Sequence, residues 1–330
     1  MSFLKTVLRM VLVTGVAVGL AGASWLFYQE KSRQDVAFAL APDGKSIVFS
    51  TDSAGGNGLR MLDLVSMRSH DLTRSSGRKD TPAFSPDGHQ IIYAAVSPGS
   101  TASHIYTYSL ADQTCKRLTS AAGVYDDMAS FSADGTQIVF ARALLHRPYS
   151  MGGWTWDHWD IYVMRSDGTG VRRLTSGEYY MVSPPRFAPD NQTIVFDANH
   201  GESNEPTVDV FKVGLTGKDP VKPLTRNGHS SEPTFTPDGK HIIYVSDAAV
   251  AYDYEVWSMD HDGGHPTQLT NEHSFLHSPL VMQDGKHFLV LADKARAIRY
   301  DLYEFDIDGT HPRRVADNTL FDRPLYWKLK

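Results

Sequence analysis

The chain has 330 residues, of which 41% are hydrophobic and 21% charged, and its formal net charge is −6. These proportions are typical of a folded globular protein rather than a disordered one. Binding to phosphate backbones needs clustered positive charge, and the sequence contains no block of basic residues, so a nucleic-acid partner is excluded. A single cysteine, Cys115, excludes an intramolecular disulfide.

Residues 1–34 form an N-terminal segment of their own. Lys5 and Arg9 precede an uncharged stretch of 19 residues, 10–28. This stretch is longer than the apolar region of most cleaved signal peptides and ends in aromatic residues, which suit a membrane interface. The segment therefore favours a signal anchor, a single apolar helix held in the inner membrane.

The alternative is a cleaved signal peptide, because Ala21-Gly22-Ala23 offers a small-x-small cleavage site before Ser24. Both interpretations export residues 35–330. We expect a periplasmic or other extracytoplasmic location, with residues 10–28 anchoring the protein in the inner membrane if the segment is retained.

The rest of the chain is organised by a short motif that occurs six times. In its clearest copy, Phe84-Ser85-Pro86-Asp87-Gly88 precedes the apolar triplet Ile91-Ile92-Tyr93. The aspartates of the six copies are Asp43, Asp87, Asp134, Asp190, Asp238 and Asp284. Their spacings of 44, 47, 56, 48 and 46 residues indicate a repeat architecture.

Each repeat contains the signals of four short strands. The Asp-Gly pair supplies the left-handed backbone of a tight turn, and a β-branched or aromatic triplet such as Ile138-Val139-Phe140 follows it. A third strand comes later, as in Ile161–Met164, and a fourth ends in Leu-Thr, as in Leu174-Thr175. Four short antiparallel strands repeated six times predict a six-bladed β-propeller over residues 35–330. The predicted fold is thus all-β, preceded by one N-terminal apolar helix.

The repeat pattern resembles a known family. Pro-x-Phe-Ser-Pro-Asp-Gly, then Ile-x-Phe/Tyr, then Asp/Glu-Ile-Tyr/Trp and finally Leu-Thr is similar to the TolB-type propeller repeat, from about residue 36 to residue 330. The resemblance implies a TolB-like six-bladed β-propeller. It leaves the chemistry open, because the family includes binding proteins, accessory domains of peptidases and a few enzymes. Residues 324–327 match the start of a further repeat, and we expect them near residues 37–40, where the ring would close.

Strand direction assigns the connections to two ends of the propeller. The connections between second and third strands share one end and hold 11, 11, 20, 13, 11 and 11 residues. The 20-residue connection, 141–160, contains three of the six tryptophans. Exposed aromatic side chains on a loop indicate recognition of a protein, peptide or sugar. The alternative is that they pack over the neighbouring blade.

The fourth repeat contributes a polar, acidic connection, 197–205, next to this loop. We predict that the two connections together form the ligand-binding surface. Its predicted residues are Tyr149, Trp154, Trp156, His158, Trp159 and His200.

A second candidate set should surround one mouth of the central channel. Its predicted members are Asp80, Asp127, Glu232, His277 and Asp322. Converging carboxylates could hold a cation such as calcium, a peptide amine or basic side chains. The alternative is that each carboxylate caps its own turn. We predict no other cofactor, and no two histidines show a spacing that identifies metal ligands.

The function predicted from these features is that of an exported, non-catalytic propeller. It would bind a protein, a peptide or an envelope polysaccharide on the end that carries the long third-blade loop. The alternative is a polysaccharide lyase or hydrolase resembling oligogalacturonate lyase, with a histidine and carboxylate site on the same face. The recurrent acidic residue before the third strand (Asp160, Asp209, Glu255, Asp301) is interpreted as a structural part of the repeat.

Overall fold

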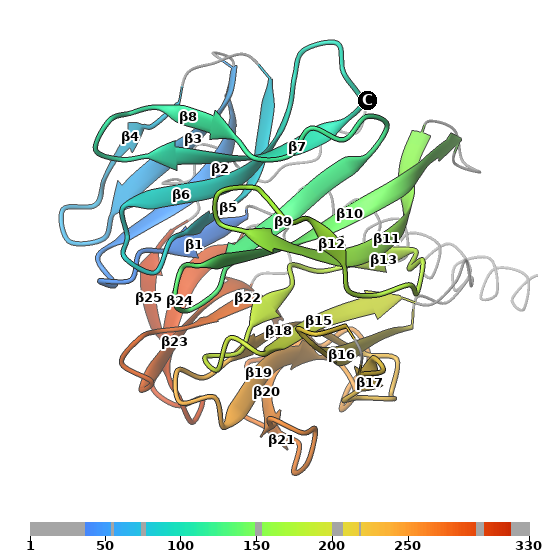
Figure 1. The fold of residues 1–330 in the computed structure, drawn as a ribbon. Coiled ribbons are helices and arrows are strands. Elements are labelled where there is room, and N and C mark those ends of the chain that lie inside the picture. The colour runs from blue at the N-terminus through green and yellow to red at the C-terminus, as the bar shows by residue number, and fades with distance from the viewer. Residues whose placement is uncertain are drawn as a thin grey trace, which may run out of the picture.

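The computed structural model describes residues 37–53, 56–73, 77–148, 154–199, 207–217, 219–294 and 300–317. These residues form strands and turns and contain no helix (Figure 1). None of these residues belongs to a helix that is long and apolar enough to cross a membrane. The predicted N-terminal helix, the region 1–34 and residues 324–327 lie outside them.

The strands form antiparallel meanders that follow one another in chain order. The first meander comprises β1 (Phe38–Leu40), β2 (Ser46–Ser53), β3 (Gly56–Asp63) and β4 (Arg68–Asp71). The second comprises β5 (Arg78–Phe84), β6 (Gln90–Val96), β7 (Ser103–Ser109) and β8 (Cys115–Arg117). The third comprises β9 (Tyr125–Phe131), β10 (Gln137–Pro148), β11 (Trp154–Arg165) and β12 (Arg172–Arg173).

The remaining strands continue the same order. The fourth meander comprises β13 (Met181–Val182), β14 (Arg186–Phe187), β15 (Thr193–Asn199), β16 (Val208–Gly214) and β17 (Lys222–Pro223). The fifth comprises β18 (Ser230–Phe235), β19 (His241–Ser246), β20 (Glu255–Asp260) and β21 (Thr267–Gln268). The sixth comprises β22 (Phe275–Val281), β23 (His287–Asp293), β24 (Asp301–Asp306) and β25 (Arg313–Ala316).

Hydrogen bonding within the meanders agrees with the predicted four-stranded antiparallel units. The first, fifth and sixth meanders are separate four-stranded sheets. The second and third belong to one eight-stranded sheet, joined where Ser103 of β7 pairs with Tyr125 of β9 in the parallel sense. The innermost position of the fourth meander is divided between β13 and β14, which both pair with β15. The fold is therefore an all-β propeller built from four-stranded antiparallel sheets.

The Asp-Gly motif forms the turn between first and second strands, as predicted. In the second meander, the Ser85 hydroxyl donates to Asp87 Oδ1 at 2.6 Å, and the same oxygen accepts from the backbone N–H of His89 at 3.0 Å. Gly88 has φ of +71°, a conformation that costs glycine little. In the fourth meander Asn191 occupies this position with φ of 56°, since asparagine tolerates the left-handed region better than most residues.

The Leu-Thr signal fixes the fourth strand to the third. The threonine hydroxyl accepts a hydrogen bond from a backbone N–H of the third strand at 2.9–3.0 Å in five meanders: Thr73, Thr119, Thr175, Thr225 and Thr270. In three of them the hydroxyl also donates to the acidic residue before the third strand, Asp160, Asp209 or Glu255. These acids thus have the structural role that the sequence predicted.

Six hydrophobic clusters hold the meanders to one another. Each cluster combines buried residues of two consecutive meanders, as where Ile92 and Ile105 pack with Phe140 between the second and third. The same arrangement occurs at the other junctions along the chain. One cluster joins the last meander to the first, because Leu289 and Leu302 pack with Phe49. Packing therefore closes the ring.

The first testable prediction concerns the Leu-Thr joint of the fifth meander. The Thr270 hydroxyl accepts from the Val256 N–H at 2.9 Å and donates to Glu255, and all three groups are buried. Thr270→Val keeps the shape but leaves both partners unsatisfied, which should lower the free energy of unfolding by about 1–3 kcal/mol. Urea denaturation measures the change.

Thr310→Val is the matched control for Thr270→Val. Its hydroxyl bonds to Asp308 in an exposed turn, where water can replace it. Equal losses for the two variants would show that the buried joint contributes nothing beyond an exposed turn contact.

Candidate functional site

The predicted long loop, 141–160, is largely a β-hairpin. β10 and β11 each run for 12 residues and pair in one register from Gln137 and Arg165 to Pro148 and Trp154, with a single gap at Leu144 and His158. The physical reason lies in the alternation Trp154-Thr155-Trp156-Asp157, whose period of two suits a strand with one apolar and one polar face. The third meander therefore projects an extended hairpin, residues 141–148 and 154–160, where the sequence predicted an irregular loop.

The hairpin separates the three tryptophans that the sequence grouped together. Trp159 is only 9% exposed and belongs to the cluster between the third and fourth meanders. Trp156 is half-buried: its ring lies 4.7 Å from His146 and 5.5 Å from Tyr125 between centroids. Trp154 is 61% exposed and meets the ring of His146 at 5.1 Å. Of the three, only Trp154 presents most of its surface to solvent.

Polar contacts fix the hairpin in place. Trp156 Nε1 donates to the backbone carbonyl of Thr101, in the connection between β6 and β7, at 3.1 Å. Arg147 forms an ion pair of 2.5 Å with the buried carboxylate of Asp157. His158 has φ of 56° at the gap in the hairpin pairing, and its Nδ1 lies 3.9 Å from Glu178. Two members of the predicted set, Tyr149 and His200, lie outside the described residues.

The channel residues occupy bulges in the innermost strands. Thr81, Met128, Glu232 and Ser278 all have positive φ, and the pairing register shifts at the same places in β5, β18 and β22. A β-bulge re-aims the side chains beside it. The bulges bring polar groups of consecutive meanders together at the axis.

Hydrogen bonds to carboxylates link neighbouring meanders at these bulges. The Thr81 hydroxyl donates to Asp127, the Glu232 N–H donates to Asp197 at 2.6 Å, and the Ser278 N–H donates to Glu232 at 2.5 Å. The sequence offered turn capping as the alternative to ligand binding. The structure shows capping across the junction, with a partner about one repeat away in the chain.

The predicted channel residues form two pairs. Arg78 pairs with Asp80 in β5, and this ion pair lies beside Asp127. Glu232 lies 3.8 Å from Nδ1 of His277, whose ring also contacts Tyr254 and Tyr300. Asp322 lies outside the described residues. No three His, Cys, Asp or Glu side chains are placed to hold a metal ion in the described part of the chain.

Burial changes the titration of the channel carboxyls. It raises the pKa of Asp127 to about 6, and the nearby Asp80 raises it further, whereas the bond from Thr81 opposes the shift. Burial also raises the pKa of Asp80, although Arg78 lowers it. Asp197 is 4% exposed, and burial raises its pKa to about 7. The sequence placed Asp197 in the polar, acidic connection 197–205. The signal that identifies it as buried is its place directly after a buried triplet in β15.

Comparison with known proteins supports the fold. The chain is 27% identical over 193 residues to the Tol-Pal system protein TolB of Francisella tularensis subsp. mediasiatica, and the match spans 58% of this chain and 40% of that relative. The solved structure of TolB from Acinetobacter baumannii superposes with a TM-score of 0.62 at 22% identity and covers 82% of this chain and 63% of that one. The chain carries a TolB-like β-propeller.

Two further matches are to proteins that carry the names of enzymes. Residues 152–248 match the family described as the dipeptidyl peptidase IV (DPP IV) N-terminal region. A structure of oligogalacturonate lyase in complex with manganese superposes with a TM-score of 0.63 at 18% identity, covering 86% of this chain and 79% of the lyase. At this level of identity the likeness establishes the fold alone.

The second prediction uses the raised pKa of Asp197. The folded state holds this proton up to pH about 7, whereas an unfolded aspartate loses it near pH 3.9. A raised carboxyl pKa contributes stability that is present at low pH and is lost as pH rises toward 7. Asp197→Asn removes this titration and should stabilise the protein, relative to wild type, by about 1–3 kcal/mol more at pH 8 than at pH 5.

Urea denaturation across this pH range gives the measurement. Asp238→Asn is the control, because hydrogen bonds in its exposed turn lower the pKa of that carboxyl and no loss of stability above pH 5 is expected from it. A constant difference between Asp197→Asn and wild type from pH 5 to pH 8 would contradict the assignment.

Proposed function

We propose that this chain is an exported, non-catalytic, six-bladed TolB-like propeller. In this proposal each meander is one blade, and residues 1–34 direct export and hold the protein in the inner membrane through residues 10–28. The working end is the one with the β10–β11 hairpin, and the ligand is a protein or peptide of the cell envelope. The curated relative belongs by name to the Tol-Pal system, which supports an envelope role.

One observation carries this proposal: Trp154 is exposed at the start of β11, in a hairpin whose described strands are held by side-chain contacts. The ring stack of Trp156 and the Arg147–Asp157 ion pair hold the hairpin. A large aromatic side chain on a rigid support loses little conformational freedom on binding, which is typical of an interface hot spot.

Other exposed apolar side chains lie at the same end. Leu144 and Leu145 of β10 are each about two-fifths exposed. Val250 and Tyr252, in the connection between β19 and β20, are more than half exposed. Both connections join a second strand to a third, so strand direction places them at the same end as Trp154. A protein or peptide ligand could contact several of these side chains at once.

The carboxylates at the channel would add charge to this surface. Asp127 and Glu232 would make the channel acidic, because Arg78 offsets Asp80 and Asp197 is protonated up to about pH 7, and the field favours ligands with basic groups. Such charges act mainly on the association rate and its dependence on salt.

A second candidate function is suggested by the lyase likeness together with two histidine pairs. At the end that carries the hairpin, His229 Nδ1 lies 3.0 Å from Asp247, and His273 Nδ1 lies 2.8 Å from Asp253. Histidine and carboxylate pairs can supply general acids and bases. Incubation with oligogalacturonate and manganese separates the two functions, because a lyase would release unsaturated products and a binding propeller would leave the substrate intact.

The third prediction tests the hairpin directly. A photo-crosslinking amino acid at position 154 should capture an envelope partner in cells, whereas the same residue at Val65 should capture none. Val65 is a still more exposed apolar position, but it lies in the turn between β3 and β4 at the opposite end. Equal crosslinking from both positions would contradict the proposed face.

Substitutions then distinguish recognition from packing. Trp154→Ala should cost about 2 kcal/mol or more of binding energy to the captured partner and leave the melting temperature unchanged. Trp156→Ala removes the stack on His146 and Tyr125 and should lower the melting temperature. If Trp154→Ala instead lowered stability and spared binding, the hairpin would serve packing alone.

A further inference from the structure

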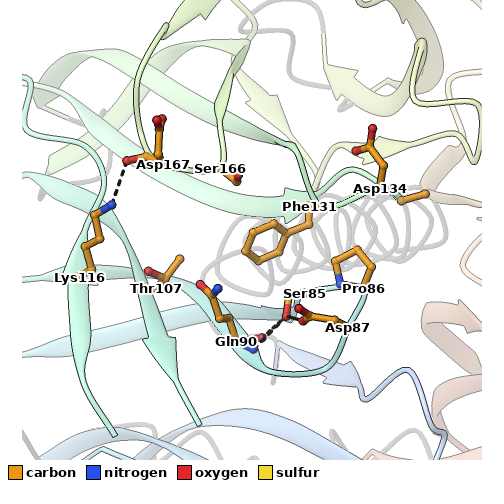
Figure 2. A pocket seen from close by; sticks show the side chains of 12 residues that line it. Ser85, Pro86, Asp87, Gln90, Thr107, Lys116, Phe131, Asp134, Ser166 and Asp167 are labelled. Carbon is orange, nitrogen blue, oxygen red and sulfur yellow. Dashed lines mark hydrogen bonds between the residues drawn. The ribbon is translucent and has the colours of Figure 1, made fainter. Parts of the chain in front are cut away.

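A cavity of about 460 Å³ lies between the second and third meanders. It is at the end with the Asp-Gly turns, opposite the β10–β11 hairpin. Figure 2 shows Phe131 and Pro86 on one side and Thr107, Gln90 and Lys116 on the other. Its volume lies within the range of small-molecule sites in proteins.

The cavity exists because two small hydroxyl residues occupy positions that the first and third junctions fill with apolar side chains. Ser166 is the residue of the β11–β12 turn whose N–H donates to the carbonyl of Thr136 at 2.9 Å. The residues that make the equivalent backbone bond in the other meanders are Leu64, Leu110, Leu215, His261 and Ile307. Each of them is larger than serine, and four are aliphatic.

The facing position on the preceding third strand completes the comparison. At the first junction Met61 faces Leu110, and at the third Val163 faces Leu215, with both pairs packed in the hydrophobic clusters. At the second junction the pair is Thr107 and Ser166, and both line the cavity. Two hydroxyl side chains thus stand where the first and third junctions have a pair of apolar side chains.

Neither hydroxyl has a hydrogen-bond partner among the described residues. Thr107 is only 6% exposed, yet its side chain lines the cavity. Both hydroxyls are open to the cavity and are available to water or to a ligand. The side-chain amide of Gln90 likewise has no partner among the described residues. The cavity therefore presents several donors and acceptors that a polar ligand could satisfy.

The charges around the cavity restrict the ligand. Lys116 lines it, with Nζ 3.2 Å from the carbonyl oxygen of Asp167. The Asp87, Asp134 and Asp167 carboxylates surround it, and hydroxyl hydrogen bonds hold the pKa of each below its ordinary value. Three ionised carboxylates disfavour an anion. They outnumber Lys116, so an anion carries the larger penalty, and a neutral polar ligand avoids it.

We propose that this cavity binds a neutral saccharide unit. Sugar hydroxyls match the hydroxyls of Thr107 and Ser166 and the amide of Gln90, while the C–H face of a pyranose suits the ring of Phe131. The site is independent of the proposed protein-binding end. Either could fail without the other.

Ligand-observed saturation-transfer NMR on the full chain tests the proposal. The probes are glucose, N-acetylglucosamine and its linear trimer, with galacturonate as the anion and arginine as the cation. We expect saturation transfer to at least one neutral sugar and none to galacturonate or arginine. Tighter binding of the trimer than of N-acetylglucosamine would assign the site to a polymer, and equal binding would assign it to a free sugar.

The matched variant is Thr107→Met with Ser166→Leu, which copies the Met61 and Leu110 pair of the first junction. It should abolish the sugar signal while the melting temperature stays the same or rises, so unfolding cannot explain the loss. Thr107→Val keeps the volume, removes one hydroxyl and should weaken binding about tenfold. Lys212→Met, at the equivalent strand position of the fourth meander, should change nothing.

Three results would overturn the proposal. They are the absence of transfer to every neutral sugar, an undiminished signal in the Thr107→Met, Ser166→Leu variant, and saturation transfer to arginine or galacturonate in place of sugar.

Discussion

Burial between consecutive meanders is the constraint on which this fold depends. A four-stranded sheet has two faces, and here the second strands are apolar on both: Ile91 packs toward the first meander and Ile92 toward the third. No meander can bury both faces alone, so each needs a neighbour on either side. The cluster that joins Leu289 to Phe49 meets this requirement for the two ends of the described chain. Stability is therefore a property of the ring, and the surfaces at its two ends are free to vary.

Local signals in the sequence predicted the repeating part of the fold because each depends on residues close together in the chain. Asp87 and Gly88 specify a turn within five residues, and Thr270 bonds to a strand that begins 15 residues earlier. The prediction of an irregular loop over 141–160 was wrong because it rested on the length of the connection and not on its residue pattern. Trp154 and Trp156 alternate with Thr155 and Asp157, and that alternation, rather than the count of aromatic residues, specified strand β11.

The polar groups at the axis show what a single sequence does not provide. The sequence placed Asp127 and Glu232 in the predicted channel set from their places in the repeat, but their partners, Thr81 and the N–H of Ser278, lie 46 residues away. That pairing depends on bulges at positive φ in Thr81 and Ser278, which neither residue type favours. Strained backbone at the centre of the ring is held by the surrounding sheets. It fixes the channel carboxylates before any ligand arrives.

The two ends of the ring differ in how a departure from the repeat creates a surface. At one end the third repeat gains residues, and β10 and β11 extend to carry Trp154 beyond the neighbouring connections. At the other end nothing is inserted: the second junction loses apolar volume at Thr107 and Ser166, and a cavity results. An insertion is visible as an altered spacing, whereas a substitution of equal length becomes visible only when equivalent positions of all repeats are compared. Because the Asp-Gly turns keep those positions in register, each position of one repeat can be compared with the equivalent positions of the others. A specific function is best sought at the position where one repeat differs from the rest.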